Sequence, residues 1–376
     1  MNIDEAILLT HDRLAGEGEN MGDLLGHFRN RVSPVLVGDR EWEQVMECAG
    51  QLPITMGALP FGFELPLHEA RPQADFGASL ASGTNMAACF EERARTDGTD
   101  ELAQAIVRLF REMDAGNSPL REIVGRKLML EYDIGSAPDG KQTYPGMFLR
   151  PGERPIIGPA INNDQWNDVD IAANALVSCV GWEKNEVQQQ VLERVYRVQP
   201  IDTRMDSFGI FPSRSRSLRL AIMGFKGQEE LNAYLADTAW PGDVEAVESV
   251  ISRFRERVGI ERTGINVDVQ ESGLGPTLGL TLIVKQRYTK DSRYWLDGLT
   301  DWEPFLEALG HEDIVVPEKL AELAGWVSKP TPLFGKTGRF VMLRGIHHIK
   351  LVVSENRLAK VKAYVFMVLS AAVSFE

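Results

Sequence analysis

Charged side chains stand at four positions in segments of this sequence that otherwise show the alternating apolar pattern of β-strands. A charge inside a packed strand costs free energy unless it is paired or hydrated. We therefore expect these strands to face a space filled by water or a ligand, where several cations could converge on one anion. Arginine suits two-point contacts with phosphate oxygens, and lysine provides a compact positive charge. The four positions are Arg219, Lys285, Lys350 and Lys362.

Two carboxylates, Glu131 and Asp133, occupy one face of a further strand-like segment, because side chains two positions apart on a strand point the same way. Lys362 and Tyr364 share a face for the same reason. The two carboxylates could pair with Arg219, or they could bind Mg²⁺ together with the oxygens of a phosphorylated ligand. The residue pattern leaves both alternatives open.

The usual short catalytic motifs are missing from the sequence. It contains no G-x-S-x-G, H-E-x-x-H or C-x-x-C, which excludes the nucleophile-elbow, zinc-protease and dithiol signatures. His347 and His348 are adjacent. Adjacent strand residues face opposite ways, so we expect only one of these rings to reach the interior space and no chelating site.

The composition limits the partners and the location of the protein. A net charge of −14 argues against a nucleic-acid partner held by overall electrostatics. The three cysteines have no metal-ligand spacing and indicate a reducing compartment. The acidic start MNIDEAILLTHDRL is unlike a signal peptide, and no apolar run approaches the ~20 residues of a membrane span. We expect a cytoplasmic protein with no membrane partner.

Pairs of strand-like segments alternate along the chain with helical ones. Strand–strand–helix order disfavours a parallel sheet, in which a helix separates successive strands. A large antiparallel sheet tends to close and so remove its edges. The pattern predicts an α+β fold, a ten-stranded antiparallel β-barrel of five hairpins surrounded by helices. The predicted hairpins are 60–69 with 74–82, 126–135 with 144–151, 205–214 with 217–225, 264–272 with 277–288, and 339–354 with 358–369.

We expect one domain over 1–376, with an N-terminal helical stretch at 1–55 and the hairpin and helix repeats at 56–376. An open α+β sheet and a division into two smaller domains are the alternatives. A ten-stranded barrel can leave room for a ligand among its inward side chains.

Three local sequences resemble the ABBA-type aromatic prenyltransferases, whose barrel (the PT-barrel) repeats an α-β-β-α unit. They are PFGFELPL with Glu64, PSRSRSLRLAI with Arg219, and LAKVKAYVFM with Lys362 and Tyr364. The likeness is greatest to the dimethylallyltryptophan synthase (indole prenyltransferase) branch. Ala221 stands where that branch has a tyrosine, and YPGMFLRP lacks its lysine. The sequence is also similar to a poorly characterised bacterial group that shares LEYD, AWPGD and HHIKL…KAY.

The resemblance implies transfer of a prenyl group from an allylic diphosphate to an aromatic, indole-like or peptide acceptor inside the barrel, with no required cofactor. Glu64 would accept the indole N–H and act as general base. The lumen would also hold Glu131, Asp133 and Tyr132, and aromatic faces such as Tyr144 and Phe148 would shield the carbocation. The diphosphate would be bound by Arg219, Lys285, Lys350, Lys362 and Tyr364.

Other interpretations of the same residues remain. Glu64 could be a solvated edge carboxylate, and Arg214 and Arg216 could belong to an exposed hairpin turn. The barrel could bind a peptide or small metabolite without transferring anything, or it could catalyse a cyclisation in the same lumen.

Overall fold

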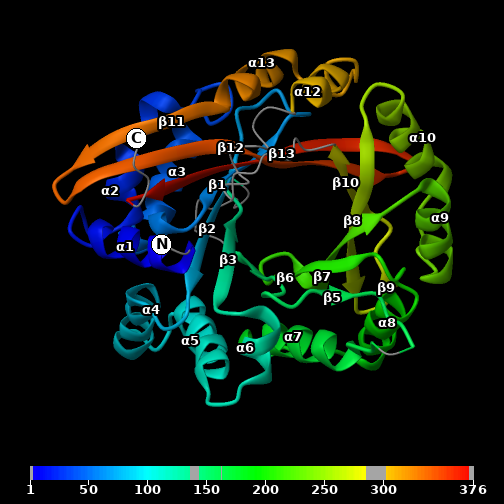
Figure 1. Ribbon diagram of the computed structural model, residues 1–376, viewed down its shortest axis with the longest axis horizontal. Coiled ribbons are helices and arrows are strands. Elements are labelled where there is room, and N and C mark those ends of the chain that lie inside the picture. The colour runs from blue at the N-terminus through cyan, green and yellow to red at the C-terminus, as the bar shows by residue number, and fades with distance from the viewer. Residues whose placement is uncertain (1–2, 136–143, 162, 285–301, 372–376) are drawn as a thin grey trace.

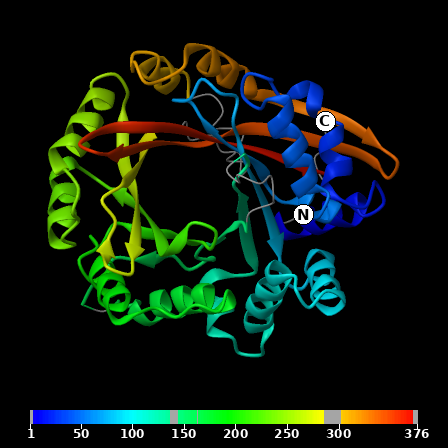
Figure 2. The ribbon, with the colours of Figure 1, turned by 180° about the vertical axis from the view of Figure 1, so that it is seen from behind.

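The computed structural model describes residues 3–135, 144–161, 163–284 and 302–371. Ten of its strands form a closed antiparallel ring, and helices surround this ring on the outside (Figures 1 and 2). The expected barrel of five hairpins is confirmed, and the architecture is that of the ABBA-type fold. In ring order the strands are β1 (Phe61–Pro66), β2 (Asp75–Ala81), β3 (Lys127–Tyr132), β4 (Gly146–Leu149), β6 (Arg204–Phe211), β7 (Ser215–Phe225), β8 (Ile260–Gln270), β10 (Leu278–Val284), β12 (Gly338–Ser354) and β13 (Arg357–Ser370).

The ring closes because each of these strands has a hydrogen-bonded neighbour on both sides. β8 pairs with β10, with Asn266 opposite Gly279, and β13 pairs with β1, with Tyr364 opposite Glu64. Closure leaves no edge among the ten strands that could pair with another chain.

Helices precede the first hairpin and lie between successive hairpins, and they cover the outer face of the barrel (Figure 1). They are α1 (Ile3–Leu14), α2 (Met21–Gly26), α3 (Asp39–Ala49), α4 (Asn85–Thr96), α5 (Glu101–Asp114), α6 (Pro119–Val124), α7 (Trp166–Cys179), α8 (Glu186–Arg197), α9 (Gln228–Asp237), α10 (Val244–Arg255), α12 (Glu303–Leu309) and α13 (Pro317–Trp326), with short 3₁₀ turns at Arg29–Arg31 and Ile54–Ala58.

The last strand shows which face of the barrel packs and which stays open. In β13 the odd-numbered residues Val361 to Leu369 are buried, whereas the even-numbered residues from Lys362 onward are only half-buried. The odd residues pack against helices, and the even residues face the lumen. The hydrophobic core therefore lies between the barrel wall and the helices, and the lumen remains accessible to solvent.

Local sequence signals explain several element boundaries. Asn20 and Asn185 form capping boxes that start α2 and α8, and such caps satisfy backbone N–H groups that have no partner inside the helix. Glu355 and Asn356 both have positive φ, 51° and 60°, and they form the two-residue turn between β12 and β13. A turn with this backbone matches the twist of the strands it joins.

Three strands lie off the ring and were not predicted: the two-residue strands β5 (Ile156–Ile157) and β9 (Gly273–Leu274), and the eight-residue strand β11 (Ser328–Gly335). β11 pairs with the first half of β12, and the two extend together beyond the ring (Figure 1). α1 lies within the helical stretch expected at 1–55. Its Thr10 accepts a hydrogen bond from the backbone N–H of Ala371, which joins the N-terminal helix to the end of the last strand.

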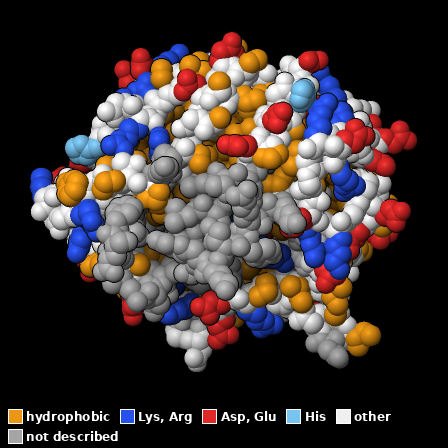
Figure 3. Space-filling model, turned by 45° about the horizontal axis from the view of Figure 1, so that its top comes forward, with side chains coloured by type: hydrophobic (Ala, Val, Ile, Leu, Met, Phe, Trp, Pro, Cys, Tyr) orange, Lys and Arg blue, Asp and Glu red, His pale blue; other side chains and the backbone are white. Residues whose placement is uncertain are grey.

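No helix among the described residues is both long enough and apolar enough to cross a membrane. On the face that Figure 3 shows, the described acidic and basic side chains are interspersed among apolar ones.

Candidate functional site

Four side chains from β12, β13 and β1 form a hydrogen-bonded group in the lumen. Lys362 forms an ion pair with the buried carboxylate of Glu64, and the nearby Tyr364 hydroxyl helps to lower the pKa of that carboxyl group. Lys350 donates from Nζ to Tyr364 Oη at 2.8 Å. Lys350 and Lys362 are direct partners across β12 and β13. The structure thus brings together four of the residues named from the sequence.

This grouping determines the charge of Glu64. Burial alone would raise the pKa of its carboxyl group, but the ammonium groups of Lys362 and Lys350 outweigh burial and lower the pKa to about 2. Glu64 is therefore a carboxylate at neutral pH and a strong hydrogen-bond acceptor. The idea that it is a solvated edge carboxylate is wrong, because its residue is 4% exposed and lies in a closed barrel.

A second group of carboxyls lies beside Glu64 on the next two strands. Asp75 on β2 is directly opposite Glu64, and Glu131 on β3 is opposite Gly77 of β2. Burial, and then the negative charge of Glu64, raise the pKa of Asp75 to about 8 and that of Glu131 to about 7. Asp75 also accepts a hydrogen bond from the Ile134 N–H at 2.9 Å. This wall of the lumen can therefore carry protons at neutral pH.

Arg219 points into the lumen from β7, but its partner is Asp268 on β8. Its Nε and Nη2 donate to the two carboxylate oxygens at 2.8 and 2.9 Å. Burial opposes the charge of Arg219, yet Asp268 more than compensates, and the pKa of the guanidinium is raised. Pairing of Arg219 with Glu131 or Asp133 was one of the alternatives, and the structure does not form it.

Arg214, rather than Arg219, pairs with Asp133 and approaches Glu131. It lies in the exposed turn between β6 and β7, as expected, and its Nε donates to Asp133 at 2.7 Å. Its Nη2 also lies 3.9 Å from Glu131. The Glu131 and Asp133 pair is thus held by an arginine. Among the described residues, no group of three or more His, Cys, Asp or Glu side chains could hold a metal ion.

Aromatic rings line the lumen beside these charges. His348 stacks on Tyr364 with ring centroids 4.1 Å apart and planes 10° apart. On the opposite wall Phe148 packs edge-on against Phe211 at 5.2 Å. Gly209 makes room for Phe148, since a Cβ at that position would lie 2.4 Å from its ring.

Tyr132 does not line the lumen, and that expectation is wrong. Its ring stacks on Phe76 with centroids 6.3 Å apart, and both residues are buried on the helix-facing side of the barrel. The neighbouring residue Glu131 points inward, so Tyr132 must point outward. Lys285 lies outside the described residues.

The two adjacent histidines also differ from the expectation. A bulge between Ile346 and His348 inserts one extra residue into β12. The rings of His347 and His348 are therefore in contact, with centroids 5.0 Å apart, so they share one side of the strand. Burial lowers the pKa of His348, which favours a neutral imidazole.

Sequence reasoning missed three lumen residues: Asp75, Phe211 and Asp268. Asp268 had a signal, because Asn266, Asp268 and Gln270 alternate with buried valines along β8. Asp75 is the first residue of a strand, and an aspartate at this point of the sequence is equally typical of the preceding turn. A register shift in the pairing of β6 with β7 lies between Ile210 and Phe211, so the direction of the Phe211 side chain did not follow from alternation.

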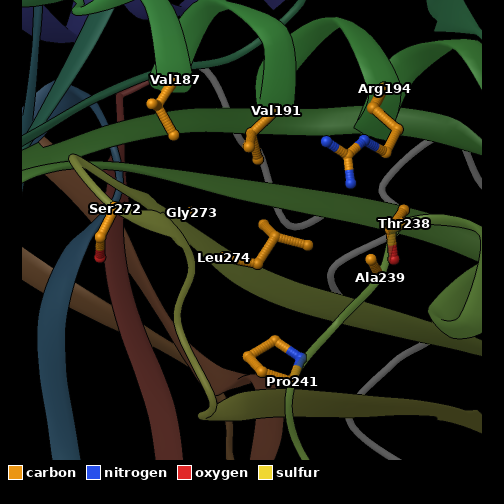
Figure 4. Close-up of a pocket in the computed structure, with 9 residues that line it drawn as sticks. All are labelled: Val187, Val191, Arg194, Thr238, Ala239, Pro241, Ser272, Gly273 and Leu274. Atoms are coloured by element: carbon orange, nitrogen blue, oxygen red, sulfur yellow. The ribbon is translucent and has the colours of Figure 1, made fainter.

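A separate pocket of about 290 Å³ lies outside the barrel, between α8, β9 and the segment after α9 (Figure 4). Val191, Leu274 and Pro241 give it an apolar floor, and Arg194 lies at its side. None of the residues predicted from the sequence line this pocket.

Comparisons with known proteins find similarity in structure but not in sequence. No family model matches the chain, and no curated protein matches it. Solved structures with a similar fold include the apo prenyltransferase PriB (14% identity, TM-score 0.48, covering 96% of this chain and 94% of that one). Another is AnaPT from Neosartorya fischeri (10%, 0.46, 81% and 77%). A third is 6-dimethylallyltryptophan synthase from Micromonospora olivasterospora in complex with DMASPP and Trp (13%, 0.45, 98% and 96%). At these identities and scores, the likeness assigns neither a substrate nor a residue role to this chain.

Proposed function

We propose that the barrel lumen binds an allylic diphosphate and an aromatic acceptor, and that it transfers the prenyl group between them. The observation that carries this proposal is the pairing of Lys350 with Lys362 directly across β12 and β13. Like charges at directly opposed strand positions destabilise a sheet. One carboxylate, that of Glu64, is within ion-pair distance of Lys362, and a bound anion would offset the remaining repulsion.

The chemistry requires three properties of this site. The C–O bond of the allylic diphosphate breaks, and its electron pair leaves with the diphosphate, whose charge fixed cations stabilise. The allyl cation is then held against aromatic faces, which Tyr364 and the stacked His348 would supply. An aromatic carbon of the acceptor forms the new bond, and the ring loses a proton to a base.

Glu64 and Glu131 would have different roles toward the acceptor molecule: one orients it and the other removes its proton. Glu64, whose pKa is about 2, is a weak base but a strong acceptor that can orient an N–H of the acceptor molecule. Glu131, whose pKa is raised to about 7 by burial and by Glu64, matches a base that works near neutral pH. We therefore assign orientation to Glu64 and proton removal to Glu131.

A second candidate function is binding of a peptide or small metabolite without transfer. One observation favours it: Arg219, Lys362 and Arg214 each already pair with a carboxylate. These carboxylates would compete with a diphosphate for the same cations.

A binding titration with dimethylallyl diphosphate, with and without Mg²⁺, separates the two candidates. We propose that Mg²⁺ is not required, so the transferase proposal predicts that dimethylallyl diphosphate binds in both conditions. Prenyl transfer to tryptophan and to a tryptophan-containing peptide is then measured by mass spectrometry. If the diphosphate does not bind at millimolar concentration, the transferase proposal is wrong and the binding function is favoured.

A further inference from the structure

Lys350 differs from the other lumen cations of the described chain. Arg214, Arg219 and Lys362 each have a carboxylate within ion-pair distance. The described partner of Lys350 is a hydroxyl, that of Tyr364, at 2.8 Å. The residue is 9% exposed, and its direct cross-strand neighbour is another cation, Lys362.

The barrel wall makes room for this lysine. Gly279 on β10 faces it, and a Cβ there would lie 3.2 Å from Lys350 Cδ. Any larger residue would press against the aliphatic stem. The stem is therefore held between β10 and β13, with Nζ at the Tyr364 hydroxyl.

Several charged groups face Lys350 from the surrounding strands. Glu64 on β1 and Glu131 on β3 favour its charged form, whereas Arg219 on β7 and Lys362 on β13 oppose it. Burial is the largest influence, and together these groups lower the pKa of Lys350 to about 8. A buried lysine beside a second cation is the environment that makes an amine nucleophilic near neutral pH.

We propose that Lys350 is a nucleophilic amine that forms an imine with small uncharged aldehydes in the lumen. A small uncharged aldehyde can reach the amine of Lys350 without displacing Glu64 from Lys362, with which Glu64 forms an ion pair. This activity goes beyond prenyl transfer and does not require it.

The reaction balances without any oxidant or reductant. The lone pair of the neutral amine attacks the carbonyl carbon, a C–N bond forms, and the C=O π pair moves to oxygen. Tyr364 donates its hydroxyl proton to that oxygen and recovers a proton from the new ammonium. The resulting hydroxyl then takes up the proton that the lysine ammonium gave to lumen water when it became the neutral amine, which releases water and leaves a protonated imine. Overall, one lysine ammonium and one aldehyde give one protonated imine and one water.

The test is reductive trapping in the wild-type protein. Acetaldehyde or benzaldehyde is added with sodium cyanoborohydride at pH 8, and alkylated lysines are identified by peptide mass mapping over time. Lys360, exposed on the same hairpin, is the internal control. We expect Lys350 to be alkylated about tenfold faster than Lys360, since a pKa near 8 leaves far more neutral amine than the reference value for lysine. Alkylation of Lys350 no faster than Lys360 with both aldehydes overturns the proposal.

Two variants test the role of each group. Lys350→Arg keeps the charge and should remove this adduct while other lysines still react. Tyr364→Phe keeps the ring but removes the hydroxyl, and it should slow adduct formation at Lys350 but not at Lys360. Equal rates at Lys350 in wild type and Tyr364→Phe would remove Tyr364 from the mechanism. The wild-type mapping stands even if a variant does not fold, and it contains no diphosphate, so its outcome is independent of prenyl transfer.

Discussion

Lys362 on β13 forms an ion pair with Glu64 on β1, and this contact joins the last strand of the chain to the first strand of the ring. Glu64 is 4% exposed, so the pair is largely shielded from bulk water. The same carboxylate interacts with two lysines and with two carboxyls, Asp75 and Glu131. Its negative charge therefore offsets the repulsion between Lys362 and Lys350. Together with burial, it raises the pKa of Asp75.

Replacing Glu64 by glutamine should destabilise the barrel. Lys362 would lose its carboxylate and would face Lys350 with no compensating charge. We expect a loss of about 2 kcal/mol in the free energy of unfolding, less than for a fully buried pair because the Lys362 side chain is 21% exposed. Urea unfolding at pH 7 measures this, and Glu69→Gln, at a more exposed glutamate, is the control. Equal stability of Glu64→Gln and wild type would contradict this role for the ion pair.

The raised pKa of Asp75 gives the stability of the protein a pH dependence whose sign can be predicted. Its pKa is raised to about 8 by burial and by Glu64, so the native chain holds a proton there that the unfolded chain releases near pH 4. The contribution of Asp75 to the free energy of unfolding is fully present below pH 4 and is lost as the pH rises towards 8. Asp75→Asn cannot ionise and keeps the oxygen that accepts the Ile134 N–H.

We therefore expect Asp75→Asn to be more stable than wild type at pH 8.5 by about 2 kcal/mol, with the difference vanishing near pH 4. Unfolding midpoints measured across this range test the sign, and Asp237→Asn, at an exposed helix end, controls for loss of a surface charge. If wild type and Asp75→Asn show the same pH profile, Asp75 is ionised in the native protein.

The barrel and its inward cations could be predicted because strand alternation depends only on local spacing. The same alternation places Arg219, Lys350 and Lys362 on the inner face. Tyr132 could have been excluded on this basis, since it neighbours the inward residue Glu131.

The partners of these cations could not be predicted, because they depend on strand order and stagger. Arg219 pairs with Asp268, 49 residues away, and Arg214 pairs with Asp133, 81 residues away. The bulge in β12 inserts one residue without any mark in the apolar pattern. This bulge alone turns His347 to the same side as His348.

The ion pair between Arg219 and Asp268 predicts that removing an acidic residue from the lumen will strengthen the binding of a diphosphate. If the lumen binds a diphosphate, Asp268 competes with it for Arg219, as the two-point contact shows. We expect Asp268→Asn to bind dimethylallyl diphosphate several-fold more tightly, and Arg219→Ala to bind it about tenfold more weakly. Isothermal titration measures both, and Arg216→Ala, on the same strand but exposed, is the control. Weaker binding by Asp268→Asn would mean that Asp268 holds Arg219 in its binding position.

Alanine substitutions at Gly209 and Gly77 test whether the aromatic wall of the lumen is tightly packed. Both glycines face inward from strands. A Cβ on Gly209 would lie 2.4 Å from the ring of Phe148, whereas one on Gly77 would meet nothing closer than 3.7 Å. Phe148 packs edge-on against Phe211, so it cannot move without disturbing that contact. We expect Gly209→Ala to lower the free energy of unfolding by about 2 kcal/mol through overpacking, and Gly77→Ala to change it little. Chemical denaturation of the two variants gives the comparison. Equal effects of the two substitutions would show that Phe148 shifts freely and that this wall of the lumen is loosely packed.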